Sequence, residues 1–156
     1  MNKKIAFIFG ITGQDGSYLA NLLINKNFKI FGFTRSKKKK NLVNLEKLSI
    51  LNKVNLFEYL KNDNKFIEKK ILKIKPSQIY ILSGLSSVKK SFSSPIETYR
   101  SNIIIPFKIL EICRKRKLDI KVYNSVSTDC FGNQKSILNE RSNFYPVSPY
   151  AKSKSY

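Results

Sequence analysis

A glycine-punctuated turn directly after the first apolar run constrains the fold of this chain more than any other feature. Residues 10–16 read Gly-Ile-Thr-Gly-Gln-Asp-Gly, between the apolar run Ile5–Phe9 and an amphipathic segment. Glycines let a backbone approach phosphate groups, and a helix that follows points its positive end at them. The spacing differs from the Gly-x-Gly-x-x-Gly of ordinary dehydrogenases, but its place between strand and helix predicts a dinucleotide-binding turn. The alternative is an ordinary strand-to-helix turn.

Strand and helix patterns alternate along the rest of the chain. Further strands are predicted at 28–34, 54–59, 78–82 and 120–126. Helices are predicted at 16–25, 42–51, 66–74 and 95–117, with Pro106 at an early turn or kink, and another from near Tyr150. This alternation predicts an α/β fold with a doubly wound parallel sheet, Rossmann-like, with ligands at the carboxyl ends of the strands. With 156 residues and no repeat or linker, we expect one dinucleotide-binding domain over residues 1–156.

Composition excludes several kinds of chemistry. The chain has no histidine, which rules out a Ser-His-Asp triad, a Cys-His pair and a His-ligated zinc site. Cys113 and Cys130 form no metal or redox motif, so we expect no metal and both thiols reduced, with Cys113 a small apolar core residue that lies on a helix. No apolar run approaches the length of a membrane span and no signal peptide is recognised. The expectation is a cytoplasmic protein without a membrane partner.

The formal net charge of +20 suits an anionic partner. Lysines are spread over almost every segment, with one true run at Lys37–Lys40, and no zinc-finger, RRM or basic-zipper pattern is present. We therefore expect no specific nucleic-acid partner, although loose electrostatic adhesion at low salt is favoured. The charge also suits a small anionic ligand such as a nucleotide.

The end of the second predicted strand bears on the choice of cofactor. NAD-binding domains place a carboxylate there, whereas this chain has Thr34, Arg35 and Ser36, followed by the lysine run. A cation and a hydroxyl suit a 2′-phosphate, so the sequence favours NADP over NAD. The alternative is a solvated basic loop.

Two later clusters carry groups suited to acid–base chemistry. Tyr150 and Lys154 are spaced to lie on one face of a helix, where the ammonium would favour the phenolate and make the tyrosine a usable base. In a lysine-rich chain, such a pair also arises by chance. Ser127, Thr128 and Asp129 follow the fifth predicted strand, where a substrate would meet a nicotinamide. These residue types are equally typical of a turn and helix cap.

Together, these residues resemble the extended short-chain dehydrogenase/reductase family, and within it the GDP-mannose 4,6-dehydratases. The likeness is carried by residues 10–20, 75–80, 86–92 and 144–150, covers nearly the whole chain, and weakens from residue 36 to 74. It implies a hydro-lyase that converts GDP-mannose to GDP-4-keto-6-deoxymannose through an internal NADP redox cycle. The full-length enzyme is expected to be a homo-oligomer.

The resemblance also implies roles by position. Tyr150 would be the redox base and Lys154 would tune it and hold the ribose. Ser127 would hydrogen-bond the sugar 4-oxygen, Asp129 would remove the C5 proton, and Thr128 would assist departure of the 6-hydroxyl. The residues implied to bind the cofactor are Gly10, Thr12, Gly13, Gln14, Asp15, Gly16, Arg35, Ser36, Leu82, Ser86, Tyr150 and Lys154.

The chain departs from the family pattern in four places. Where the family has Thr-Ser-Glu, this chain has Ser127-Thr128-Asp129. Where the family has Gly-Asp-Leu near the adenine, it has Tyr59-Leu60-Lys61, and where the family has a histidine, it has Ser87. Only Ser155 and Tyr156 follow Lys154, whereas relatives add further strands and a substrate domain. The expectation is an incomplete NADP-binding domain that lacks the C-terminal substrate domain. If the chain is complete, we expect it to bind NADP at most weakly and not to turn over. A nucleotide-sugar epimerase or 4-keto reductase, and a non-catalytic NADP-binding fragment or remnant, are the alternatives.

Overall fold

The computed structural model describes residues 3–59, 64–135 and 137–156. The chain divides into two compact units, which are treated separately below. The sheet unit consists of Met1–Ser83 with Lys108–Asn124, and the helical unit consists of Gly84–Phe107 with Ser125–Tyr156.

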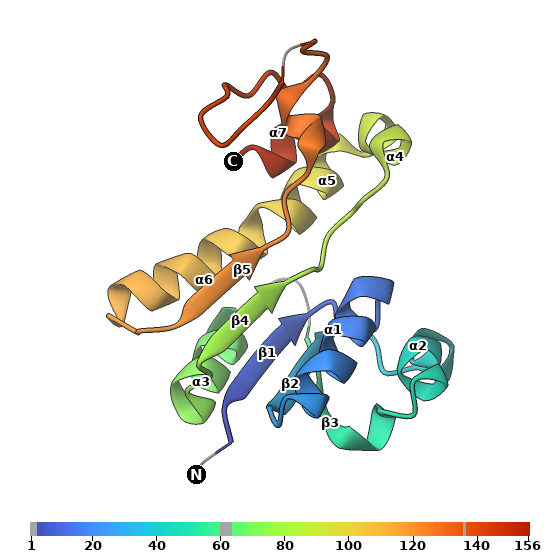
Figure 1. Ribbon diagram of the computed structural model, residues 1–156, viewed down its shortest axis with the longest axis vertical. Helices are drawn as coiled ribbons and strands as arrows, with labels where there is room; N and C mark the ends of the chain where they lie inside the picture. The colour runs from blue at the N-terminus through green and yellow to red at the C-terminus, as the bar shows by residue number, and fades with distance from the viewer. Residues whose placement is uncertain (1–2, 60–63, 136) are drawn as a thin grey trace. The chain divides into compact units, whose positions relative to one another are not determined.

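The sheet unit is built on five parallel strands in the order β3-β2-β1-β4-β5 (Figure 1). The strands are β1 (Ile5–Phe9), β2 (Lys29–Thr34), β3 (Val54–Glu58), β4 (Gln78–Ile81) and β5 (Lys121–Asn124). The chain adds β2 and β3 on one side of β1, then crosses over to add β4 and β5 on the other. This reversal between β1 and β4 is the arrangement of a doubly wound sheet, so the predicted fold class is confirmed.

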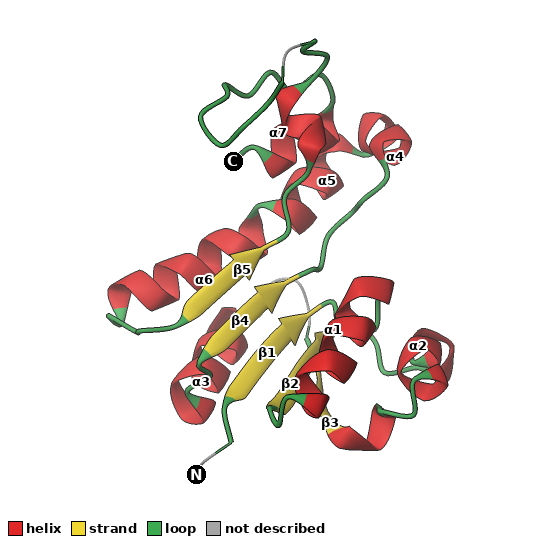
Figure 2. Cartoon of the chain, in the orientation of Figure 1, coloured by secondary structure: helices red, strands yellow, loops and turns green. Residues whose placement is uncertain are grey.

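Figure 2 shows the helices that accompany these strands. The helices α1 (Gln14–Asn25), α2 (Val43–Lys47), α3 (Asn64–Ile74) and α6 (Ile104–Lys115), and the 3₁₀ turns η1 (Lys39–Asn41) and η2 (Leu51–Lys53), connect the strands. The remaining elements are the helices α4 (Val88–Ser93), α5 (Pro95–Asn102) and α7 (Pro149–Lys154), and the 3₁₀ turn η3 (Thr128–Phe131).

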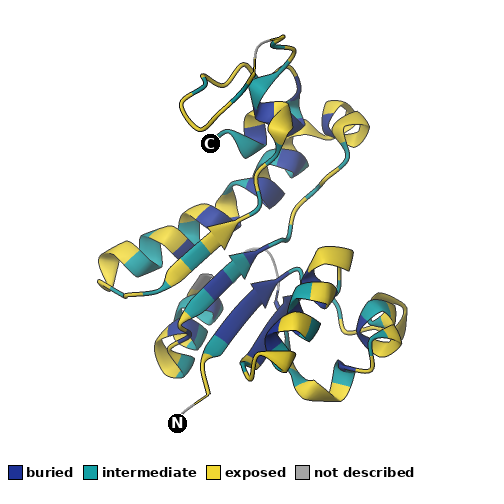
Figure 3. Cartoon of the chain, in the orientation of Figure 1, coloured by how far each residue is buried: buried dark blue, intermediate teal, exposed yellow. Residues whose placement is uncertain are grey.

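Side chains of β1 alternate between two different cores. Ala6 and Ile8 belong to an aliphatic cluster with residues of α1 and α2. Phe7 and Phe9 face the opposite side, where the ring of Phe9 stacks on Phe33 of β2 with centroids 4.3 Å apart. On that face, the ring of Phe66 of α3 packs edge-on against the ring of Phe57 of β3. Figure 3 shows β1 buried and β5 largely exposed, so apolar packing is concentrated in the middle of the sheet.

The predicted helix over 95–117 is interrupted rather than continuous. It divides at Ile103 into α5 and α6, three residues before Pro106. Proline has no amide hydrogen, so it cannot donate to the carbonyl four residues earlier, that of Asn102.

Other features differ from the prediction in smaller ways. The helix α4 was not predicted. Cys113, predicted in the core, is half-buried on α6; the fully buried thiol is Cys130, and both cysteines are free as expected.

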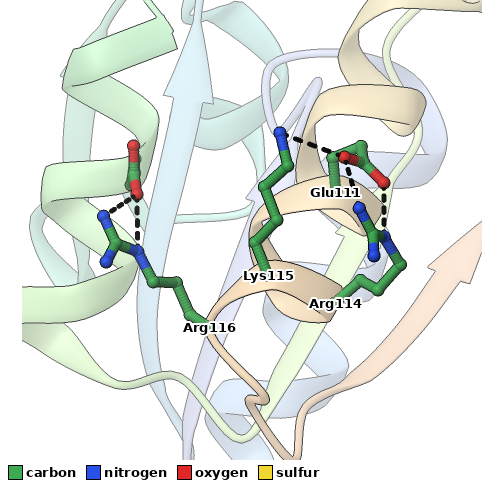
Figure 4. Close-up of polar contacts among 5 residues, drawn as sticks. Glu111, Arg114, Lys115 and Arg116 are labelled. Atoms are coloured by element: carbon green, nitrogen blue, oxygen red, sulfur yellow. Dashed lines mark hydrogen bonds and ion pairs between the residues drawn. The ribbon is translucent and has the colours of Figure 1, made fainter.

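Charged side chains near the end of α6 form local ion pairs (Figure 4). Arg114 donates to both carboxylate oxygens of Glu111, at 2.7 and 3.1 Å, and the ammonium of Lys115 lies 3.3 Å away. Arg116 pairs with Glu68 of α3 at 2.8 Å. The hydrogen bond from Arg114 is the main reason that the pKa of Glu111 is lowered to about 2.

This lowered pKa predicts a pH-dependent contribution to stability. Glu111 has a folded-state pKa of about 2, below its ordinary 4.5, so its contribution is present above pH 4.5 and is lost as the pH falls through 2. We expect Glu111→Gln to lower the urea midpoint slightly at pH 7, because the pairs are exposed, and to have no effect below pH 2. Urea titrations of both proteins check this. A pH-independent difference, or an equal effect of Glu46→Gln on α2, would contradict it.

Candidate functional site

The glycine turn of the sheet unit is shaped by close backbone contacts. Gly10 has a φ of +86°, and a Cβ there would lie 2.9 Å from the Ser83 amide nitrogen. A Cβ on Gly16 would lie 2.2 Å from the Gly10 carbonyl oxygen. The amide of Ser17 donates to the Gly13 carbonyl, as in a regular helix. The amides at the first positions of α1 have no carbonyl four residues earlier within the helix to which they could donate. Gly10 and Gly16 are therefore required by the close backbone contacts of a turn that leads directly into the first backbone amides of α1.

Of the remaining predicted residues in this turn, Gln14 and Asp15 are exposed in the first turn of α1. A carboxylate at this position stabilises the positive end of a helix, so Asp15 also has a structural reason to be there. Thr12 is half-buried, and its hydroxyl oxygen lies 3.4 Å from that of Thr34 at the end of β2.

The end of β2 places the residues predicted to select NADP near this turn. The hydroxyl of Thr34 also donates to the Ser36 carbonyl at 3.1 Å, so one buried side chain contacts both the glycine turn and the segment after β2. Arg35 is exposed. An exposed arginine is compatible both with a 2′-phosphate site and with a solvated loop.

The ends of β3 and β4 complete this edge of the sheet. Tyr59 is buried, with its ring edge-on to Phe9 at 5.8 Å. Burial raises the pKa of the Tyr59 phenol, while the Ser83 hydroxyl and the charge of Arg35 act in the opposite direction. The amide of Leu82 donates to the Phe9 carbonyl, so this residue continues the pairing of β4. Leu60 and Lys61, which depart from the family pattern, lie outside the described residues.

In the helical unit, α7 carries both Tyr150 and Lys154. Pro149 is its first residue, and the Ser148 hydroxyl caps it by accepting from the Ala151 amide at 3.0 Å. Tyr150 is buried, and the ammonium of Lys154 donates to the Ser125 carbonyl at 2.8 Å. Burial lowers the pKa of Lys154, against the effect of nearby Cys130. The predicted helix is present, and it holds a partly desolvated ammonium one turn after the tyrosine.

The three residues after β5 lie at the turn η3 in the same unit. The Ser127 hydroxyl accepts from the Asp129 amide at 3.3 Å, so it caps η3, as the structural alternative predicted. Capping uses the Ser127 hydroxyl oxygen as an acceptor and does not use its O–H group as a donor. Thr128 and Asp129 are exposed. The Cys130 thiol donates to the Ala151 carbonyl at 3.6 Å, so η3 packs on α7.

Asn102, which the sequence did not single out, organises the helical unit. Its side chain is buried, accepts from the Leu85 amide at 2.9 Å and donates to the Leu85 carbonyl at 3.0 Å. Its amide nitrogen also donates to the hydroxyl of Ser153 at 2.9 Å. Ser153 lies on α7 between Tyr150 and Lys154. Asn102 therefore fastens α7 to α5. Its one indirect sequence signal is Gly84, where a Cβ would meet the Asn102 amide oxygen at 2.4 Å.

The segment beside Asn102 also contains a predicted cofactor residue, Ser86, which is exposed. Its neighbour Ser87, which stands where the family has histidine, caps α4 by accepting from the Lys90 amide at 3.2 Å. Within the described residues, no group of side chains is arranged to hold a metal ion. Among those same residues, no helix has the length and apolar character needed to cross a membrane.

Comparison with known proteins decides the family. The model of a family described as GDP-mannose 4,6 dehydratase matches residues 7–156. The chain belongs to the GDP-mannose 4,6-dehydratase family. The resemblance inferred from the glycine turn and the segment before α7 is thus confirmed.

Curated members of this family align with the whole chain. GDP-mannose 4,6 dehydratase 2 of Caenorhabditis elegans is 34% identical over 164 residues, covering 99% of this chain and 43% of the relative. GDP-mannose 4,6-dehydratase of Vibrio cholerae is 34% identical over 167 residues, covering 100% of this chain and 44% of the relative. The chain therefore spans less than half the length of the curated relatives it matches.

Solved structures of nucleotide-sugar epimerases share the fold. The UDP-Glc/GlcNAc 4-epimerase of Campylobacter jejuni has a TM-score of 0.84 at 21% identity, covering 97% of this chain and 46% of that one. The UDP-glucose 4-epimerase of Thermus thermophilus, solved with NAD, has a TM-score of 0.79 at 21% identity, with 97% and 47% covered. At this identity the likeness establishes the Rossmann-like fold alone.

Proposed function

We propose that this chain supplies the NADP-binding part of a GDP-mannose 4,6-dehydratase. The observation that carries the proposal is the family match over residues 7–156, joined to a helix that presents Tyr150 and Lys154 one turn apart. The tight glycine contacts fit a dinucleotide-binding turn, because they let the chain turn sharply into α1, whose first backbone amides can bind a pyrophosphate. Such an enzyme acts on a nucleotide sugar, and we take GDP-mannose as the substrate.

The side chains of the helical unit divide the acid–base work in this proposal. NADP, when bound, would supply the hydride chemistry that this reaction needs at the sugar. Tyr150 takes the proton of the 4-hydroxyl, with Lys154 favouring its phenolate. The O–H group of Ser127, whose oxygen caps η3, donates to the 4-oxygen. Asp129 removes the C5 proton once C4 is a ketone, and Thr128 assists the departing 6-hydroxyl.

The choice of NADP over NAD rests on Arg35, because a guanidinium pairs well with a phosphate. We expect NADP to raise the melting temperature more than NAD at equal concentration, with about 2.7 kcal/mol of stabilisation at a hundred times the dissociation constant. Arg35→Ala should weaken NADP binding about 10-fold or more, because a hydrogen bond to a charged group is lost, and should leave NAD binding unchanged.

Arg141→Ala is the matched control for this comparison, since it removes one exposed positive charge from the helical unit. Thermal-shift titrations of the three proteins with both dinucleotides measure the effect. Equal stabilisation by NADP and NAD, or equal losses in the two variants, would show that Arg35 belongs to a solvated loop.

The reaction itself is tested in a chimera in which residues 1–156 are followed by the C-terminal part of a curated relative. Incubation with NADP and GDP-mannose is expected to form the 4-keto-6-deoxy sugar nucleotide. A folded chimera that binds NADP but forms no ketosugar would overturn the proposal. Residues 1–156 alone are expected to form none, and ketosugar from that chain would overturn this second expectation.

A further inference from the structure

A side chain from α2 holds the middle of the glycine turn. The amide nitrogen of half-buried Asn44 donates to the Thr12 carbonyl oxygen at 3.0 Å, across 32 residues of sequence. Figure 1 shows α2 beside α1 in the sheet unit. The helix α2 has five residues and buries Leu45, the residue after Asn44, in the aliphatic core, so the donor is attached to an anchored element.

This bond completes the fixation of one peptide group. The carbonyl of Thr12 and the amide of Gly13 belong to the same planar unit. The carbonyl accepts from Asn44, and the amide of Gly13 donates to the Gly10 carbonyl at 3.0 Å. The peptide plane is therefore held at both ends.

The orientation of this peptide decides how the chain enters α1. Gln14 is the first residue of that helix, so the Thr12–Gly13 peptide lies immediately before the first amides of α1, the groups that would bind a phosphate. Glycine at position 13 permits many backbone conformations, and nothing in its own covalent structure selects one. Hydrogen bonds hold the observed conformation: both ends of the Thr12–Gly13 peptide are bonded, and the Gly13 carbonyl accepts from the Ser17 amide. Of these three bonds, only the Asn44 bond uses a side chain.

We propose that Asn44 is a positioning residue that keeps the glycine turn in its phosphate-binding shape. The inference rests on the proposed function, since it concerns recognition of the dinucleotide pyrophosphate. Asn44 acts through the Thr12 carbonyl and does not contact the ligand. Thr34 braces the same residue from β2, so elements on both sides of the basic segment Arg35–Leu42 fix the turn.

Two adenine nucleotides separate this role from general stabilisation. ADP carries a diphosphate that the glycine turn would bind, whereas 2′-AMP carries only the 2′-phosphate. By isothermal titration, Asn44→Ala is expected to weaken ADP binding about 5-fold, the value of one ordinary hydrogen bond, and to leave 2′-AMP binding unchanged. Asn44→Asp keeps the shape but offers no donor to the carbonyl, and its charge opposes an anion, so we expect a loss of about 10-fold or more.

Asn55 supplies a matched control. Its amide nitrogen also donates to a backbone carbonyl, that of Ile30 at 3.3 Å, but this carbonyl lies in β2 rather than in the turn. Asn55→Ala should leave the affinities for both nucleotides unchanged. Loss of ADP binding in Asn55→Ala as large as in Asn44→Ala, equal weakening of ADP and 2′-AMP by Asn44→Ala, or unchanged ADP affinity in that variant would each overturn the inference.

A measurement without ligand tests the same claim. In the free protein, amide hydrogen exchange at Gly13 should be at least about 3-fold faster in Asn44→Ala than in wild type, and unchanged in Asn55→Ala. Equal exchange rates at Gly13 in all three proteins would show that the Asn44 side chain does not hold the turn. Wild-type protein that binds neither ADP nor NADP would instead overturn the proposed function, while the exchange comparison would still decide whether Asn44 fixes the turn.

Discussion

Replacing Gly16 with alanine is expected to abolish dinucleotide binding and to destabilise the protein. Alanine is ordinarily about 1 kcal/mol more favourable than glycine within a helix, so propensity alone predicts stabilisation. The added Cβ, however, would lie 2.2 Å from the Gly10 carbonyl oxygen and 2.8 Å from the Ile11 Cα. Both are backbone atoms, so α1 or the turn must move. Overpacking of this kind costs about 1–3 kcal/mol, and we expect the upper end of that range.

Gly13→Ala is the matched control in the same turn. A Cβ there would lie 3.3 Å from the same carbonyl oxygen, and Gly13 has a φ of −74°, which alanine adopts freely. We expect this variant to keep nearly wild-type stability. Urea unfolding and NADP titration of both variants measure the contrast. A Gly16→Ala protein as stable as wild type, with NADP binding intact, would mean that the turn is looser than its contacts indicate.

The middle of the fold follows directly from local sequence patterns. Ile5–Phe9 is apolar throughout because it is buried on both faces, and the structure has β1 over those residues. The turn and α1 were predictable for the same reason, since glycine spacing and apolar periodicity are local signals. Strands β2 to β5 were each predicted within two residues of their observed ends. The pairing of Tyr150 with Lys154 on one helix was likewise predictable from spacing alone.

The contacts that hold the glycine turn in the sheet unit and α7 in the helical unit were not predictable, because they join distant residues. Asn44 and Asn102 are ordinary polar residues in sequence, and their importance depends on carbonyl and amide partners 32 and 17 residues away. Ser127 shows a different limit. Its residue type is equally suited to a cap and to a substrate contact, and the structure shows that capping uses one of its two capacities.

Asp129→Glu, in the chimera described above, is expected to raise the rate of dehydration by up to about 100-fold. The resemblance described above implies a glutamate at this position, and aspartate is one methylene shorter. A displacement of about 1 Å of a reacting group costs about this factor. The backbone cannot advance to compensate, because the Asp129 amide is held by Ser127 and its carbonyl accepts from Gly132 at 3.1 Å. The longer side chain would restore the reach of the base.

The same substitution separates a dehydratase from an epimerase or 4-keto reductase of this fold. Those enzymes need Tyr150 and Lys154 but no base for the C5 proton, so Asp129→Glu should leave their rates unchanged. Tyr150→Phe is the reference variant, because loss of the redox base should lower either activity by about 10²–10⁴-fold. Rates are measured with saturating NADP and GDP-mannose for dehydration, and with saturating NADPH and the 4-keto derivative for reduction. A glutamate that accelerates ketosugar formation would assign C5 deprotonation to position 129, whereas an unchanged dehydration rate would remove Asp129 from the proposed mechanism.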